Sequence, residues 1–232
     1  MPYENITKSV HNPLNLYIYD NILNSSEPKI NGTRKHVPTV GFKSWGLARG
    51  GFLVDTPVGL VTTVADTIIG IGSGLCAVGT LGLHGPTCKV AAQHIENSRH
   101  ILSKPYMDLL RVLNPNAKIT TVANSSDGIF HSAARDWCGE GVESCQNSRF
   151  WLVRQVCSRL TYVLYAIAAV ITRVVDAIIG VFAAVLSFLF LGTFHGVNSY
   201  AYTGLQVTGI VNDLFMSVLG VINPGAPSLD NG

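Results

Sequence analysis

The chain has 232 residues, of which 47% are hydrophobic and only 13% are charged, and its formal net charge is +2. Soluble domains carry about 25% charged residues, so side chains suited to water are scarce in this chain. The small net charge provides no basic stripe for a phosphate backbone, and we therefore expect no nucleic-acid partner.

Residues 1–45 predict a polar N-terminal arm. Its prolines and its Asn-Ser and Asn-Gly pairs are turn signals that interrupt any continuous helix or strand. One apolar patch, residues 14–19, alternates in a way that favours a short strand or an extended segment. We therefore expect an irregular arm ahead of the apolar part of the chain.

The first long apolar stretch covers residues 58–83 and contains a single charged residue, Asp66. A helix needs about 20 residues to cross the hydrocarbon core of a membrane, and this stretch is longer than that. Gly70 and Gly74 have the GxxxG spacing that allows two helix backbones to approach closely. The stretch therefore predicts an apolar helix with a tightly packed side.

Residues 86–113 continue with an amphipathic pattern after a corner at His84-Gly85. This pattern predicts two helices that meet at Lys104-Pro105, because proline interrupts helical hydrogen bonding, and that end at Asn114-Pro115. We assign residues 46–117 to one module, which consists of an apolar helix, a His-Gly corner and amphipathic helices.

Residues 118–148 predict a polar linker. Cys138 and Cys145 bracket a polar segment, which could close into a small disulfide ring in an oxidising compartment. A pair of reduced loop thiols is the equal alternative. Cys76, Cys88 and Cys157 have apolar neighbours and are interpreted as small core residues. The five cysteines lack the close CxxC pairs of a zinc site.

Residues 149–232 form the second module, and its charges are even rarer. Residues 177–194 contain no charged side chain over 18 positions, which is the threshold length for a membrane-spanning helix. Phe150-Trp151, between Arg149 and Arg154, is typical of the interface between a membrane and water, although an ordinary helix start on a core is an equal alternative.

The two modules share a sequence. Residues 62–70 (TTVADTIIG) return as residues 172–180 (TRVVDAIIG) with six identical positions, and the motif Asn-Pro-x-Ala returns near the end of each module. Repetition of this kind indicates a supersecondary unit that buries its apolar face against its copy. We predict an all-α protein built from two tandem copies of an apolar-helix plus amphipathic-helix module, with the polar linker between them.

Asp66 and Asp176 are the strongest site candidates, since each lies inside an apolar helix where an ionisable group is costly unless it is paired. In a functional interpretation they face each other across the two modules and line a polar pathway or bind a cation. In a structural interpretation each aspartate interacts with residues one turn earlier on its own helix and stabilises that helix locally. Asp66 would interact with Thr62, and Asp176 with Thr172 and Arg173.

His84 and His195 both precede a glycine after the apolar helix. A metal site with Asp66 is disfavoured, because 18 residues of continuous helix separate Asp66 from His84 by about 27 Å. We expect each histidine to cap the C-terminus of an apolar helix, where a positive charge suits the helix dipole. No metal and no cofactor are expected.

The leading functional interpretation is a non-catalytic structural or interaction protein, embedded in or associated with a membrane, whose partners are the lipid bilayer and further copies of itself. A first alternative is the subunit of a self-assembling shell or filament, with the charge-poor half buried between copies. A second is a small two-repeat channel or carrier. The sequence contains no nucleophile elbow, Walker loop, dinucleotide fingerprint or HExxH motif, so we expect no enzymatic activity.

Overall fold

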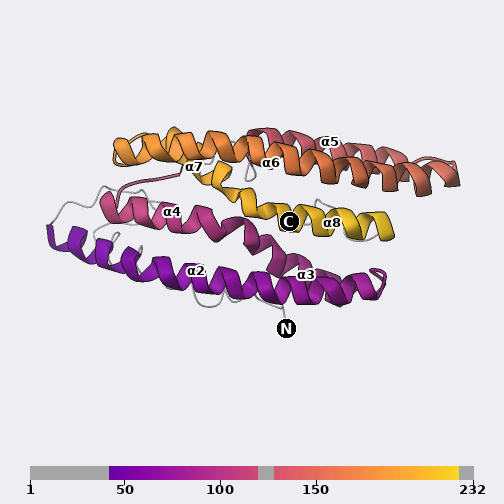
Figure 1. Ribbon diagram of the computed structural model, residues 1–232, viewed down its shortest axis with the longest axis horizontal. Helices are drawn as coiled ribbons and strands as arrows, with labels where there is room; N and C mark the ends of the chain where they lie inside the picture. Colours follow the sequence, from indigo (N-terminus) through magenta and orange to yellow (C-terminus); the bar gives the residue numbers. More distant parts are fainter. Residues whose placement is uncertain (1–41, 120–127, 225–232) are drawn as a thin grey trace, which may run out of the picture.

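The computed structural model describes residues 42–119 and 128–224, so the predicted N-terminal arm lies almost wholly outside the described residues. Within these two ranges the chain is helical and contains no strand. The predicted all-α class is therefore confirmed for this part of the chain. The helices are packed lengthwise into an elongated bundle (Figure 1).

The first half consists of one long helix and a broken helix that folds back along it. The long helix is α2 (Phe42–Gly79), and the broken helix consists of α3 (Gly85–Glu96), the 3-10 turn η3 (Asn97–Arg99) and α4 (His100–Leu113). The sequence correctly predicts two helices here but misplaces their junction. Pro105 lies inside α4, and the chain breaks at η3.

The second half has a similar order of elements with an additional helix in front. This additional helix is α5 (Ile129–Gln146). A π-helical turn, η4 (Val153–Cys157), leads into the long helix α6 (Ser158–Leu189). The broken helix that follows consists of α7 (His195–Gly204), the 3-10 turn η5 (Leu205–Gly209) and α8 (Ile210–Ile222).

Both long helices end in the same left-handed turn. Leu81 and Leu191 have φ angles of 53° and 50°, and the glycine after each has a φ of 68°. A leucine in this region is uncommon, whereas glycine adopts it without a steric penalty and commonly terminates helices. The apolar helix therefore ends at Gly79 in the first half and at Leu189 in the second.

The two halves run in opposite directions. Asn114, just after α4, donates from Nδ2 to the Leu191 carbonyl oxygen at 2.8 Å, so the end of the first broken helix lies at the second turn. A Cβ atom placed on Gly82, in the first turn, would meet a side-chain atom of Leu219 near the end of α8 at 3.2 Å. Each turn therefore packs against the other half's broken helix, and α2 and α6 are antiparallel (Figure 1).

The two helix breaks contact each other near the middle of the bundle. Thr208 Oγ1 donates to the Ser98 carbonyl oxygen at 2.5 Å, and Ser98 Oγ donates to the Thr208 carbonyl oxygen at 3.3 Å. These hydroxyls satisfy carbonyl groups at positions where the helical hydrogen-bond pattern is interrupted. This contact explains why the first broken helix breaks at η3. The contact is with a distant part of the chain, so the sequence pattern around Pro105 gives no sign of it.

Residues 129–146 of the predicted polar linker are not an irregular connection but form the helix α5. This helix buries Cys138 and Val142 against a cluster of α6 residues that includes Tyr165. Cys138 and Cys145 are both on α5, seven residues and therefore about 10 Å apart along its axis, which is too far for a disulfide. Both thiols are free, and burial raises the pKa of Cys138 to about 12.

Three helical segments are long and apolar enough to cross a membrane, judged by length and composition. They are residues 45–79 in α2, 153–189 in η4 and α6, and 195–222 from α7 to α8. In their most apolar windows only 39%, 33% and 39% of the residues are buried by the rest of the protein. Much of the apolar surface of each segment is therefore left uncovered by the chain itself.

Candidate functional site

Asp66 on α2 is fully buried and accepts two hydrogen bonds from the broken helix opposite. His94 Nδ1 on α3 and Asn97 Nδ2 on η3 each lie 2.9 Å from one of its carboxylate oxygens. An ionised Asp66 carboxylate only accepts hydrogen bonds, and it pairs with the His94 tautomer that has its proton on Nδ1. Asp66 therefore holds the end of α3 and the start of the break against the middle of α2.

Asp176 on α6 occupies the corresponding sequence position but has a different role. Its two carboxylate oxygens accept the backbone N–H groups of Phe130 and His131, at 3.2 and 2.9 Å. These are orphan donors of the first turn of α5, and a carboxylate there also suits the positive end of the helix dipole. The residue at the cap position is Gly128, which has no side chain to do this. Asp176 thus caps α5 from another helix.

Gly128 is required by this cap. Its φ angle is +92°, and a Cβ atom at this position would lie 2.5 Å from Asp176 Oδ2. Any side chain would therefore both strain the backbone and displace the carboxylate.

A second buried network lies between α5, α6 and α8. Arg173 Nε donates to Asp213 Oδ2 at 2.9 Å, and the Tyr165 hydroxyl donates to Asp213 Oδ1 at 3.3 Å. His131 Nε2 lies 3.5 Å from Asp213 Oδ1, which is longer than an ordinary hydrogen bond. Arg173 Nη1 also donates to the Gln206 carbonyl oxygen on η5, at 3.4 Å. Arg173 therefore attaches both the second break and α8 to α6, as Asp66 attaches the first break to α2.

Thr62 and Thr172 bond mainly within their own helices. The Thr62 hydroxyl donates to the Gly59 carbonyl oxygen at 3.1 Å, and the Thr172 hydroxyl donates to that of Ala168 at 2.8 Å. Thr172 Oγ1 also lies 3.4 Å from His131 Nδ1, which connects it to the edge of the Arg173 network.

The structure separates the two aspartates that the functional interpretation brings together. α2 and α6 lie on opposite sides of the bundle, with α4 and α8 between them (Figure 1). Asp66 and Asp176 therefore do not face each other, and each belongs to its own network.

The two predicted histidine corners lie at helix starts, which corrects the expected C-terminal caps. His84 is the residue before α3, and its Nδ1 lies 2.5 Å from Thr87 Oγ1, whereas His195 is the first residue of α7. The reason is that the left-handed turns end the long helices before the histidines. Within residues 42–119 and 128–224, no group of three or more His, Cys, Asp or Glu side chains is placed to hold a metal ion.

Sequence reasoning missed the residues that complete the networks, His94, His131 and Asp213. One signal was available for Asp213, because it is one of only four charged residues after Leu160. A charge so rare in an apolar region indicates a buried partner. His131 carried no such signal, since it lies in the segment whose composition predicts a polar linker.

Over the described residues, the class that fold and site define is an all-helical protein with three segments capable of crossing a membrane. Asp66, Arg173, Asp176 and Asp213 are buried and hydrogen-bonded in its interior. Comparison of this chain with models of protein families, with curated proteins and with solved structures finds no match.

Proposed function

We propose that the chain is an integral membrane protein that acts through helix packing, as a structural or interaction component, and catalyses no reaction. The observation that carries this proposal is the uncovered apolar surface of the long helices. On α6, Ile171, Phe182 and Leu189 are 58%, 70% and 71% exposed. Few charged side chains are near them in the sequence to make this surface suited to water. Contiguous apolar surface of this extent is costly in water and is stable against lipid chains.

The arrangement of charges supports the same proposal. Asp66, Arg173 and Asp176 on the long helices and Asp213 on α8 are at most 4% exposed, so these helices direct the four charges toward the protein interior. Ionisable groups in membrane-spanning segments characteristically face the bundle interior and pair with one another or with backbone groups. Asp66 is hydrogen-bonded to side chains of the broken helix, Asp176 to backbone N–H groups of α5, and Arg173 is paired with Asp213.

Equivalent contacts in the two halves support an internal duplication in which the copies are antiparallel. Arg49 Nη2 donates to the Leu113 carbonyl oxygen at the end of α4 at 3.0 Å, and Arg159 Nε donates to the Val221 carbonyl oxygen near the end of α8 at 2.9 Å. Arg49 and Arg159 are 110 residues apart, as are Asp66 and Asp176. Each arginine thus stabilises the C-terminal dipole of its own broken helix.

The test is stepwise extraction of the full chain from membranes of expressing cells. We expect retention through a high-salt wash and alkaline carbonate, and release only by detergent, because the apolar helices need lipid or detergent around them. Size-exclusion chromatography of the released protein then measures its self-association. Release without detergent as a large uniform particle would contradict the membrane proposal and favour the shell or filament subunit.

A small carrier is the second candidate, favoured by the two broken helices whose breaks meet at Ser98 and Thr208. Transporters built from antiparallel repeats place discontinuous helices near the middle of the bilayer, with polar groups at the break. In this chain the Asp66 and Arg173 networks lie beside the two breaks.

The carrier is tested by proton flux into liposomes that contain the purified full chain, driven by a potassium gradient with valinomycin and read by an internal pH dye. A carrier that uses Asp66 is expected to conduct above protein-free liposomes and to lose this flux in Asp66→Asn. Asp136→Asn is the control, because Asp136 lies on α5, outside both networks. Flux equal to that of protein-free liposomes would favour the purely structural function.

A further inference from the structure

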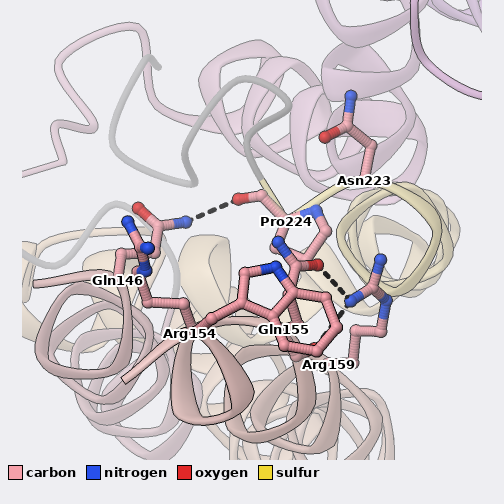
Figure 2. A pocket seen from close by; sticks show the side chains of 7 residues that line it. Gln146, Arg154, Gln155, Arg159, Asn223 and Pro224 are labelled. Atoms are coloured by element: carbon pink, nitrogen blue, oxygen red, sulfur yellow. Dashed lines mark hydrogen bonds between the residues drawn. The ribbon is translucent and has the colours of Figure 1, made fainter. Parts of the chain in front are cut away.

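A pocket of about 400 Å³ lies where α6 begins, between η4, the end of α5 and the end of α8. Seven residues line it (Figure 2): Gln146, Trp151, Arg154, Gln155, Arg159, Asn223 and Pro224. Two of these are cations, and no acidic side chain is among them. The volume is within the range of sites that bind small molecules or headgroups.

The two arginines contribute differently. Arg159 is bonded within the protein, since it donates to the Val221 carbonyl oxygen at 2.9 Å and to Gln155 Oε1 at 2.6 Å. It therefore supplies positive charge and shields the carbonyl end of α8. Arg154 is exposed and forms no ion pair with a described residue, so its guanidinium donors are available to a ligand. It is held in the π-helical turn η4, and such turns are frequent at functional sites.

The neutral residues of the lining, like the two arginines, supply hydrogen-bond donors that suit an anionic ligand. Gln146 Nε2 donates to the Pro224 carbonyl oxygen at 2.5 Å, which closes one side of the pocket (Figure 2). The Trp151 indole N–H is a donor only. Arginine forks and neutral N–H donors without a competing carboxylate are the chemistry that recognises phosphate.

The pocket also lies at a particular depth of the proposed membrane protein. Its lining residue Trp151 and the neighbouring Phe150 are 65% and 73% exposed, and the apolar segment that could cross a membrane begins at Val153. Exposed aromatic residues at the start of such a segment lie at the level of the lipid headgroups. The phosphate groups found at the depth of the lipid headgroups are those of phospholipids.

The geometry points to this pocket as a binding site for a phosphate group, and to an anionic phospholipid headgroup as its source. The assignment of a phospholipid as the source of the phosphate rests on the proposed function as a membrane protein. The assignment of the pocket as a phosphate site does not depend on that proposed function. Arg154 is the ligand-contacting cation, and Arg159 maintains the charge and shape of the site.

The experiment uses the full chain purified in a neutral detergent, with phosphatidylglycerol, phosphatidylcholine or inorganic phosphate added at matched ionic strength. Retained lipid is counted by native mass spectrometry, and the melting temperature is measured in parallel. Phosphatidylglycerol is expected to be retained and to raise the melting temperature, whereas phosphatidylcholine has little effect. Arg154→Gln is expected to weaken phosphatidylglycerol binding roughly tenfold, because one charged hydrogen-bond donor is lost.

Arg149→Gln is the matched control, since Arg149 is exposed and close in sequence but does not line the pocket. It is expected to bind phosphatidylglycerol as the unaltered chain does. Equal binding by the unaltered chain and Arg154→Gln, or equal retention of the two lipids, would overturn the inference. Stabilisation by inorganic phosphate that Arg154→Gln abolishes, without lipid retention, would keep the phosphate site and overturn the lipid as its source. A chain that is soluble without detergent would contradict the proposed function separately, and the phosphate arm would still test the pocket.

Discussion

Replacing Asp213 by leucine is expected to lower the free energy of unfolding by about 3–5 kcal/mol. Arg173, its partner at 2.9 Å, is only 3% exposed, so the change leaves a guanidinium buried without its counter-charge. The Tyr165 hydroxyl loses the carboxylate to which it donates. The loss is measured by equilibrium unfolding of the full chain in mixed detergent micelles.

A double substitution separates the cost of an unpaired charge from the value of the pair. Arg173→Met with Asp213→Leu is expected to recover most of the stability lost by either change alone, because replacement of both members by apolar side chains removes the uncompensated charge. Arg149→Met is the control for the loss of an arginine, and an exposed position of this kind is expected to change stability by about 0.5 kcal/mol or less. Additive losses in the double variant would show that the two side chains are not coupled.

Gly180→Ala is expected to destabilise the protein by roughly 1–3 kcal/mol, although alanine is the better helix former. A Cβ atom at position 180 would lie 2.6 Å from the Gly204 Cα atom and 2.7 Å from its carbonyl carbon. Both of these are backbone atoms, which cannot rotate away. The substitution therefore forces α6 and α7 apart at their crossing, and it is measured as a lower melting temperature in detergent.

Gly72→Ala is the matched control within a long helix. A Cβ atom there would meet no other heavy atom within 4 Å, so only helix propensity changes and stability is expected to rise by up to about 1 kcal/mol. Gly70→Ala is expected to behave like Gly180→Ala, because its Cβ would lie 2.6 Å from the Ile95 backbone nitrogen. A Gly180→Ala variant as stable as Gly72→Ala would contradict the close packing of α6 on α7.

The sequence predicts those parts of the candidate site that depend on local pattern. Asp66 and Asp176 are recognisable because each is a charge within an apolar helix, and both are buried and hydrogen-bonded. Their partners are not recognisable in the same way. His94 is 28 residues from Asp66, and Asp213 is 40 residues from Arg173, so these contacts arise only when distant helices are brought together.

The sequence by itself determined that the apolar stretches form helices, that these helices are apolar enough for a membrane, and that charges within them are exceptional. These properties follow from hydropathy and periodicity, which are read over one or two helical turns. Only the tertiary structure decided that residues 129–146 are a helix, that the first broken helix breaks at Asn97–Arg99, and that α2 and α6 are antiparallel. The physical reason is that the stabilising groups are remote: the carboxylate of Asp176 caps α5, and Thr208 satisfies the carbonyl group of Ser98.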